Sequence, residues 1–287
     1  GLVSMDRERK DGYYLYQAYL KEAPVLHIAS KSWKNRAGAS RDGKSCTQPL
    51  KVYTNADKVE VFLNGKSLGV YPVSDKVVSV DIPFINGENV VDAVIEKEGR
   101  EYRDQYVCNF QCVNVKNGFT EVNVLLGAQR YFEDRTAELC WIPEQAYEKG
   151  SWGYIGGESK SSQIQIKNTN DGPLFQTLRN GIEGYRFDVP NGVYEIEFLF
   201  TDIFRENAAT VYQLGRNSDV ENRENRFDII INDQTIEESF SPCRESDYFH
   251  ALRKRYNITN FRNKIEIRFP VRNGKSFLNG IKLRKLY

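Results

Sequence analysis

The sequence predicts an all-β protein made of two β-sandwiches in tandem, preceded by one short helix. Apolar and polar residues alternate with period two over many short runs, which is typical of half-buried strands. Asn-Gly pairs end several of these runs, as at 64–65 and 191–192, and favour the tight turns of β-hairpins. The length of 287 residues suits about two domains of this kind.

Residues 6–22 predict the helix, because Leu15, Ala18 and Tyr19 recur three and four apart and Pro24 stops the run. The segment is rich in tyrosine, and such an aromatic face normally packs on a large partner. Since no second helix is predicted nearby, we expect residues 1–23 to be the end of a preceding domain. The chain starts with Gly1 and shows no export signal there, so we expect further sequence upstream.

Residues 24–115 predict the first sandwich. Val59, Val61 and Leu63 lie two apart and lead into the Asn-Gly turn at 64–65, and further alternating runs follow at 77–82, 90–96 and 102–108. About seven short strands at this spacing indicate a sandwich of immunoglobulin type.

Residues 116–287 predict a larger sandwich of jelly-roll type. Tyr194, Ile196, Phe198 and Phe200 lie on one face of a strand whose other face carries glutamates. Further strands are expected at 122–126, 226–231, 265–269 and 279–283. We expect residues 127–163 to be loop-like, and residues 205–225 to form a surface excursion with some helix.

Composition excludes several classes of protein. The chain has 40 basic and 39 acidic side chains, and its net charge of +1 argues against nucleic-acid binding or a polybasic membrane anchor. No apolar run approaches the roughly 20 residues that a membrane-spanning helix needs. Aromatic residues make up 13% of the chain, which is ample for two packed cores.

The cysteines and histidines predict neither a disulfide framework nor a metal site. The cysteines are odd in number and widely scattered, and neither His27 nor His250 is close to Cys108 and Cys112 in sequence. No carboxylate cluster has calcium-ligand spacing. We therefore expect no metal or cofactor. The thiols expected to be free and at least half-buried are Cys46, Cys108, Cys112, Cys140 and Cys243.

No catalytic motif stands out, because GxSxG, HExxH, GxGxxG and P-loop patterns are all absent from the sequence. The most unusual stretch is Ser-Trp-Gly-Tyr-Ile-Gly-Gly at 151–157. Flat rings beside flexible glycines suit stacking against the C–H face of a sugar, and they equally suit a glycine-rich turn whose rings enter the core. The stretch Asp-Ile-Phe-Arg at 202–205 suits ligand contact or a solvated loop, and Asn-Gly-Lys at 273–275 favours a turn.

The first part of the chain resembles family 2 glycoside hydrolases of the β-galactosidase type. RKDGYYLYQA at 9–18 and PVLHI at 24–28 are similar to the join between the last helix of the catalytic barrel and an immunoglobulin-like domain. VYTNADKVEVFLNGKSLG at 52–69 is very similar to the signature of that domain. The resemblance implies that residues 1–23 come from the barrel and residues 24–115 form the immunoglobulin-like sandwich.

The second part resembles malectin-like carbohydrate-binding domains. The similar pieces are WGYIGG at 152–157, PLFQT at 173–177, YRFDVPNGVY at 185–194, FTD at 200–202 and RFDIIIN at 226–232. The sequence departs from the family in Asp202, where glutamate is usual, and in the insertion at 205–225.

The malectin resemblance implies four sugar-contacting residues. Tyr154 and Phe204 would stack on sugar rings, and Arg179 and Asn273 would hydrogen-bond sugar hydroxyls. The loops that carry these residues would lie at one end of a malectin-like sandwich formed by residues 116–287.

Together the resemblances imply the C-terminal part of a β-galactosidase-type hydrolase, whose malectin-like domain binds a galactoside-containing glycan. The chain has no Asn-Glu pair of the kind that carries the family's acid/base, so we expect it not to hydrolyse glycosides. The alternative is a structural or oligomerisation module without a sugar ligand. In the carbohydrate-binding reading, the partners of the chain would be carbohydrate and the upstream barrel, and the family implies a periplasmic or extracellular location in bacteria.

Overall fold

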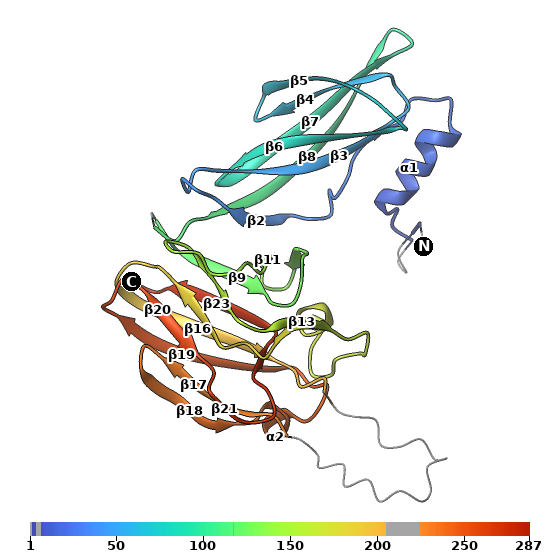
Figure 1. The fold of residues 1–287 in the computed structure, drawn as a ribbon. Helices are drawn as coiled ribbons and strands as arrows, with labels where there is room; N and C mark the ends of the chain where they lie inside the picture. Colours follow the sequence, from blue (N-terminus) through green and yellow to red (C-terminus); the bar gives the residue numbers. More distant parts are fainter. Residues whose placement is uncertain (1, 4–6, 117, 205–223) are drawn as a thin grey trace, which may run out of the picture. The chain divides into compact units, whose positions relative to one another are not determined.

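The computed structural model describes residues 2–3, 7–116, 118–204 and 224–287. The chain divides into two compact units, which we call the first and second sandwich. The first comprises Gly1–Val113 with Arg135–Leu139, and the second comprises Asn114–Asp134 with Cys140–Tyr287. The predicted all-β fold with a short N-terminal helix is confirmed (Figure 1).

The first sandwich has two sheets that enclose an apolar core. The three-stranded sheet has the order β1-β3-β6, and the five-stranded sheet has the order β2-β8-β7-β4-β5, in which β2 alone pairs in parallel. Its strands are β1 (Leu26–Ile28), β2 (Asn35–Ala39), β3 (Ser45–Thr54), β4 (Lys58–Leu63), β5 (Lys66–Pro72), β6 (Val77–Ile85), β7 (Gly87–Lys97) and β8 (Arg100–Val113).

The core of the first sandwich follows the predicted alternation. Val59, Val61 and Leu63 of β4 face inward together with Phe84 and Phe110, whose rings stack at 4.9 Å. The Asn-Gly turn between β4 and β5 is confirmed, since both residues have positive φ. Sequence reasoning missed β2 and β5, because their short runs contain Gly38 and Gly69 and do not alternate cleanly.

Helix α1 (Asp11–Leu20) begins five residues later than predicted. Before it, Lys10 donates from its backbone N to the carbonyl of Leu2 at 3.0 Å. The helix is fixed to β1: Asp11 bonds the His27 ring at 3.0 Å and accepts from the Ser30 backbone N at 2.8 Å. The Tyr14 ring stacks on His27 with centroids 3.7 Å apart.

The second sandwich has two main sheets and one small sheet. Their orders are β10-β11-β9-β23-β16-β19, β12-β15-β20-β17-β18 with β21 also pairing with β17, and β13-β14-β22. Its elements are β9 (Glu121–Leu125), β10 (Phe132–Asp134), β11 (Leu139–Pro143), β12 (Trp152–Ile155), β13 (Glu158–Ser161), the 3₁₀ turn Gly172–Leu174, β14 (Thr177–Asn180), β15 (Gly184–Phe187), β16 (Gly192–Phe200), β17 (Arg226–Ile231), β18 (Gln234–Phe240), α2 (Pro242–Ser246), β19 (Leu252–Asn260), β20 (Ile265–Arg268), β21 (Val271–Asn273), β22 (Phe277–Leu278) and β23 (Gly280–Lys285).

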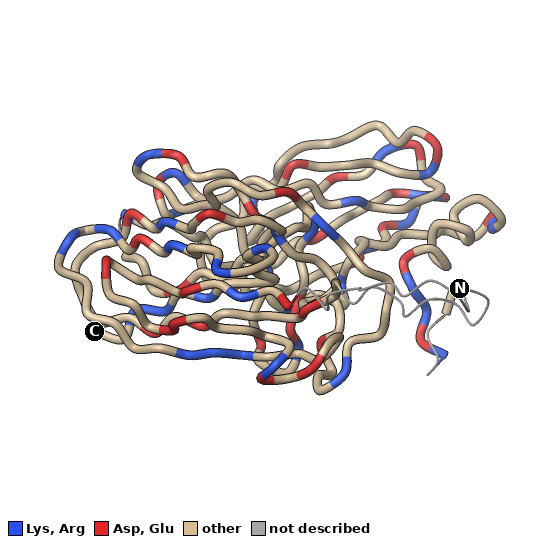
Figure 2. Tube along the Cα trace, turned by 60° about the horizontal axis from the view of Figure 1, so that its bottom comes forward, with Lys and Arg blue, Asp and Glu red and all other residues tan. Residues whose placement is uncertain are grey.

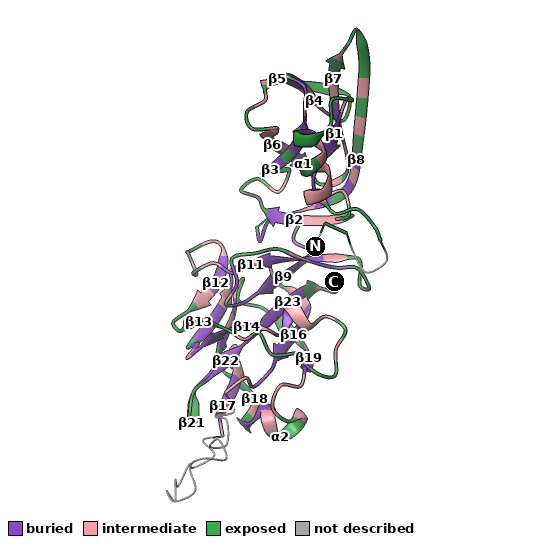
Figure 3. Ribbon diagram, turned by 90° about the vertical axis from the view of Figure 1, so that its right-hand side faces the viewer, coloured by how far each residue is buried: buried purple, intermediate pink, exposed green. Residues whose placement is uncertain are grey.

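Phenylalanines fill the space between the two main sheets. Phe198 and Phe200 of β16 meet Phe227 and Phe240 of the facing sheet and Phe269, which directly follows β20, with ring centroids 4.9–6.1 Å apart. The buried strands appear purple in Figure 3. Burial of such rings is the main stabilising contribution to a core of this kind.

The prediction that residues 127–163 are loop-like was wrong, because β10 to β13 lie in this segment. These strands have three to five residues each, which is too short for alternation to show in sequence. Most of the predicted excursion at 205–225 lies outside the described residues.

Charge is mixed throughout, as composition predicted. Figure 2 shows basic and acidic residues interspersed along the described trace. Among the described residues, no helix is both long and apolar enough to cross a membrane.

Candidate functional site

Tyr154 lies on β12 and is held by backbone pairing on both sides. It pairs with Tyr185 of β15, donates from its backbone N to the carbonyl of Gln145 and accepts from the Tyr147 backbone N, both at 3.0 Å. Gly153 permits this close approach, because a Cβ there would lie 2.4 Å from the Tyr147 nitrogen. Tyr154 is half-buried.

Arg179 of β14 lies directly on the Tyr154 ring, with the guanidinium carbon 3.3 Å from the ring centroid. It is buried and forms a two-pronged ion pair with Glu144, through Nε–Oε2 at 2.8 Å and NH2–Oε1 at 2.6 Å. The carbonyl of Gly157 accepts from NH1 at 2.8 Å. Burial is the largest single effect and lowers the pKa of Arg179, but the hydrogen bond to Glu144 and the attraction of its charge together raise the pKa above its ordinary value.

Arg179, predicted to hydrogen-bond sugar hydroxyls, has its donors engaged with the protein itself. The Ser159 hydroxyl, at 3.4 Å, and the Gly156 carbonyl, at 3.5 Å, take its remaining donors. A sugar hydroxyl would therefore have to displace a protein acceptor. In this structure Arg179 fixes one face of Tyr154.

A second group of side chains lies beyond the end of β16 and includes Phe204. Its ring packs edge-on against Phe277 of β22 with centroids 5.7 Å apart, and its backbone N donates to Asp202 at 3.0 Å. Asp202 is fully buried and accepts from the Asn225 side chain at 3.2 Å. Burial raises the pKa of Asp202.

Asn273 ends β21 and is exposed. Its side-chain nitrogen donates to the Glu224 carbonyl at 2.7 Å. Gly274 follows with φ of 65°, and a Cβ there would lie 2.4 Å from Oδ1 of Asn225, so this turn requires glycine. Asn225 Oδ1 also accepts from the Lys275 backbone N at 2.9 Å. The amide of Asn225 thus joins the Asn273 loop to Asp202.

The structure brings the four predicted residues into two groups on neighbouring strands. Tyr154 and Arg179 touch, and Phe204 and Asn273 both border the Asp202–Asn225 pair. The groups are joined by β14 and β22, where Asn180 pairs with Phe277. The predicted residues therefore form two groups that the small sheet β13-β14-β22 connects.

Sequence reasoning missed Glu144 and Tyr185, which complete the first group. Both are buried, and burial raises the pKa of Tyr185 well above its ordinary value, with the Glu144 charge adding to the effect. Glu144 follows β11 in the stretch taken for loop, and an isolated acid there gives no pattern. Only the tertiary contact with Arg179 distinguishes Glu144 from the other acidic residues.

The metal and cysteine predictions concern the whole chain. Within the described part, no group of three or more His, Cys, Asp or Glu side chains is placed to hold a metal ion. The five cysteines are free thiols, with Cys108, Cys112 and Cys140 buried.

Comparison with known families covers both sandwiches. The malectin domain model matches residues 120–281, which is more than half of the chain. The chain belongs to the malectin domain family. A second model, a domain of unknown function (DUF4982), matches residues 46–103 within the first sandwich.

Solved structures extend this likeness to the whole chain. The crystal structure of a Bacteroides uniformis β-glucuronidase is 46% identical in sequence, with a TM-score of 0.91. The match spans 100% of this chain and 33% of the β-glucuronidase chain. Bacteroides uniformis β-glucuronidase 2, covalently bound to cyclophellitol-6-carboxylate aziridine, is also 46% identical with a TM-score of 0.89 and the same coverage. A Formosa agariphila protein, provisionally named a β-glucuronidase, is 34% identical over 124 residues, which are 41% of this chain and 14% of that protein.

The chain thus spans about a third of the length of its solved relatives. It corresponds to the C-terminal region of a family 2 glycoside hydrolase, as the sequence predicted. The named relatives are β-glucuronidases, whereas the sequence analysis expected the β-galactosidase type. A galactoside preference therefore stays a prediction.

Proposed function

We propose that the second sandwich is a carbohydrate-binding module of a β-glucuronidase-like family 2 glycoside hydrolase. The observation that carries the proposal is the half-buried Tyr154, whose ring is fixed from one side by Arg179. A rigid aromatic ring binds a sugar face with little loss of conformational freedom. Membership of the malectin domain family supports the same assignment.

In this proposal the other predicted residues have distinct roles. Phe204 offers a second, half-buried ring, and the exposed Asn273 amide offers its oxygen to sugar hydroxyls. Arg179 acts as a positioning residue, because its donors are already engaged with Glu144 and backbone carbonyls. The sugar would then be recognised by stacking first and by hydrogen bonds second.

Isothermal titration of the 287-residue chain with a glycan panel tests the proposal. The panel contains glucuronides, galactosides and neutral glucans. Tyr154→Ala is expected to weaken binding about tenfold or more, equivalent to about 1.4 kcal/mol, and Tyr154→Phe to retain it. Phe261→Ala is the matched control, because Phe261 is an exposed ring elsewhere on the same sandwich. Absence of heat with every glycan would overturn the proposal.

We place hydrolysis in the parent protein and not in this chain. No Asn-Glu pair of the acid/base kind occurs in the sequence, and the names of the relatives favour a β-glucuronide substrate for the whole protein. A chromogenic β-glucuronide and a chromogenic β-galactoside, each incubated with this chain, are expected to give no turnover above blank. Turnover of either would refute this part of the proposal.

A purely structural role is the second candidate, and the saturated donors of Arg179 favour it. In that case the Glu144–Arg179 pair would only stabilise the sandwich that supports the parent hydrolase. Glycan titration separates the two: a structural module gives no heat, and Tyr154→Ala then changes stability alone.

Export to the periplasm or cell surface is also part of the proposal, on the strength of the family resemblance alone. Fractionation of cells that produce the full-length protein tests it. Recovery of the protein in the cytoplasmic fraction would contradict it.

A further inference from the structure

A hollow of about 410 Å³ lies between two loops of the second sandwich. One wall is the segment 181–183, between β14 and β15, and the other is formed by residues 268–271 and 274–276. Neither Tyr154 nor Phe204 lines it. Its volume is in the range of small-molecule binding sites.

Backbone hydrogen bonds fix both walls of the hollow. Gly181 donates from its N to the Ser276 carbonyl at 2.7 Å, and Phe269 donates to the Glu183 carbonyl at 3.0 Å. The buried Ser276 hydroxyl donates to the Ile182 carbonyl at 2.5 Å. The hollow is therefore pre-formed, and a ligand need not order these loops.

The lining combines an apolar floor with charged groups at the rim. Ile182 and Phe269 are buried, and Val271 is half exposed, so an apolar ring face would find a partner there. The charged lining residues are Arg268, Lys275 and Glu183. Cations therefore outnumber acids two to one, in a chain whose charges are balanced overall.

Both cations keep capacity for an anionic ligand. The Lys275 side chain is 62% exposed, and its ammonium lies 3.9 Å from the Glu158 carboxylate, which is beyond hydrogen-bond distance. Arg268 is half exposed and donates to Asp233 through NH2 at 3.0 Å. Within the described part of the chain, its Nε and NH1 have no hydrogen-bond acceptor.

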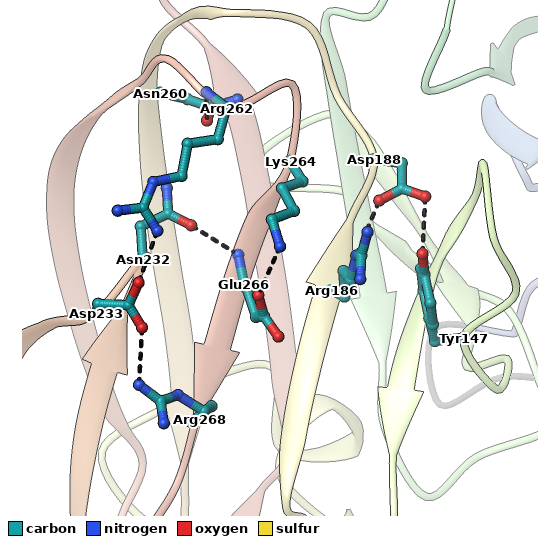
Figure 4. Close-up of polar contacts among 10 residues, drawn as sticks. All are labelled: Tyr147, Arg186, Asp188, Asn232, Asp233, Asn260, Arg262, Lys264, Glu266 and Arg268. Carbon is teal, nitrogen blue, oxygen red and sulfur yellow. Dashed lines mark hydrogen bonds and ion pairs between the residues drawn. The ribbon is translucent and has the colours of Figure 1, made fainter.

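Arg262 provides an internal comparison for Arg268. Asp233 pairs with both arginines, with one through each carboxylate oxygen. The side chains of Arg262 and Arg268 are 52% and 51% exposed. Figure 4 shows them approaching Asp233 from opposite sides. Arg268 alone of the pair lines the hollow.

We propose that this hollow binds a sugar that carries a carboxylate, that is, a uronic acid residue of a glycan. The carboxylate pairs with Arg268 and Lys275, and the C–H face of the sugar ring lies on Val271 and the apolar floor. Charge-assisted hydrogen bonds are stronger than neutral ones, so the two cations select an acidic over a neutral sugar. The inference rests on the proposed carbohydrate binding and adds a second subsite, apart from Tyr154, with its own ligand class.

Titration calorimetry with three probes tests the proposal: a trisaccharide of 1,4-linked uronic acid, its methyl ester, and a neutral trisaccharide of the same linkage. The free acid is expected to bind at least about tenfold more tightly than the ester, with an affinity that falls as salt rises. Arg268→Gln and Lys275→Gln are each expected to remove most of that preference. Arg262→Gln is expected to retain the preference for the acid, although this substitution also removes an ion pair with Asp233.

Two results would overturn the inference. One is equal affinity for the acid and its ester; the other is an equal loss from Arg262→Gln and Arg268→Gln. If a neutral glycan binds and Tyr154→Ala abolishes that binding, the proposed function stands while the acidic specificity fails. If no probe or panel glycan binds at all, carbohydrate binding itself fails.

Discussion

The interiors of the two sandwiches differ in kind. Among described residues, the first sandwich buries one Asp, Glu, Lys or Arg side chain, Asp92. Its other buried polar residues are His27, Ser40, Gln48, Thr54 and Asn89, and they surround a large apolar cluster. The second buries Glu133, Asp134, Glu144, Arg179, Glu197, Asp202 and Asp228. A buried charge requires a partner, and breaking such a pair costs more than the pair itself contributes. The stability of the second sandwich should therefore depend more on buried charge pairs than that of the first.

Glu144→Gln is the sharpest way to break this comparison and has the largest expected effect. It removes the charge that pairs with buried Arg179, and we expect a loss of about 3–5 kcal/mol from the free energy of unfolding of the second sandwich. Amide hydrogen exchange should show faster exchange in β12 and β14 and unchanged exchange in the first sandwich. Glu195→Gln is the control, because its pair with the half-exposed Arg284 is worth at most about 1 kcal/mol.

An equal, small loss from Glu144→Gln and Glu195→Gln would mean that the Glu144–Arg179 pair is not a structural requirement. The positioning role of Arg179 on Tyr154 would then lose its basis.

Ile82→Ala probes the apolar interior of the first sandwich. Ile82 is completely buried on β6, and truncation leaves a cavity, so we expect a loss of about 2–5 kcal/mol. The change should be confined to the first sandwich, because the chain forms two compact units. Exchange rates of peptides from each unit measure it, and faster exchange of similar size in both units would contradict independent stability.

The contrast between the interiors also explains what the sequence could predict. In the first sandwich, burial follows period two, so Val59, Val61 and Leu63 identify their strand and its inner face directly. In the second sandwich, the alternation of residues predicted β16 equally well, and the WGYIGG motif indicated Tyr154. The Glu144–Arg179 pair could not be predicted from the sequence, because its members are 35 residues apart and meet only in the folded chain. Long-range polar pairing leaves no local period.

Tyr194→Phe removes one buried hydrogen bond and should have a modest effect. The Tyr194 hydroxyl donates to the Pro190 carbonyl at 2.7 Å, and burial raises the pKa of Tyr194 to about 12. We expect a loss of about 0.5–1.5 kcal/mol in the second sandwich, because the ring itself stays packed. Urea denaturation, followed by exchange of peptides from β16, measures this loss. A loss as large as that from Glu144→Gln would show that neutral polar groups matter as much as the buried ion pair.

The smallest effect concerns the acid dependence of the second sandwich. Hydrogen bonds from Arg272 lower the pKa of Asp228 in the folded state, and the Ser239 backbone N adds to this. A lowered folded pKa means that the stabilisation is present above the unfolded value of about 3.9 and is lost as pH falls through the folded pKa. Wild type should therefore exceed Asp228→Asn in stability at pH 6, and the gap should shrink below about pH 4.

Arg272→Gln checks the cause of that acid dependence, because it removes the donor and leaves the carboxylate. The stability difference between wild type and Arg272→Gln should shrink over the same pH range as the difference between wild type and Asp228→Asn. The double variant should be little less stable than either single variant. Urea midpoints measured from pH 6 to pH 3 provide the comparison. If the stability difference between wild type and Asp228→Asn instead stays constant down to pH 3, Asp228 contributes by packing and not by its charge.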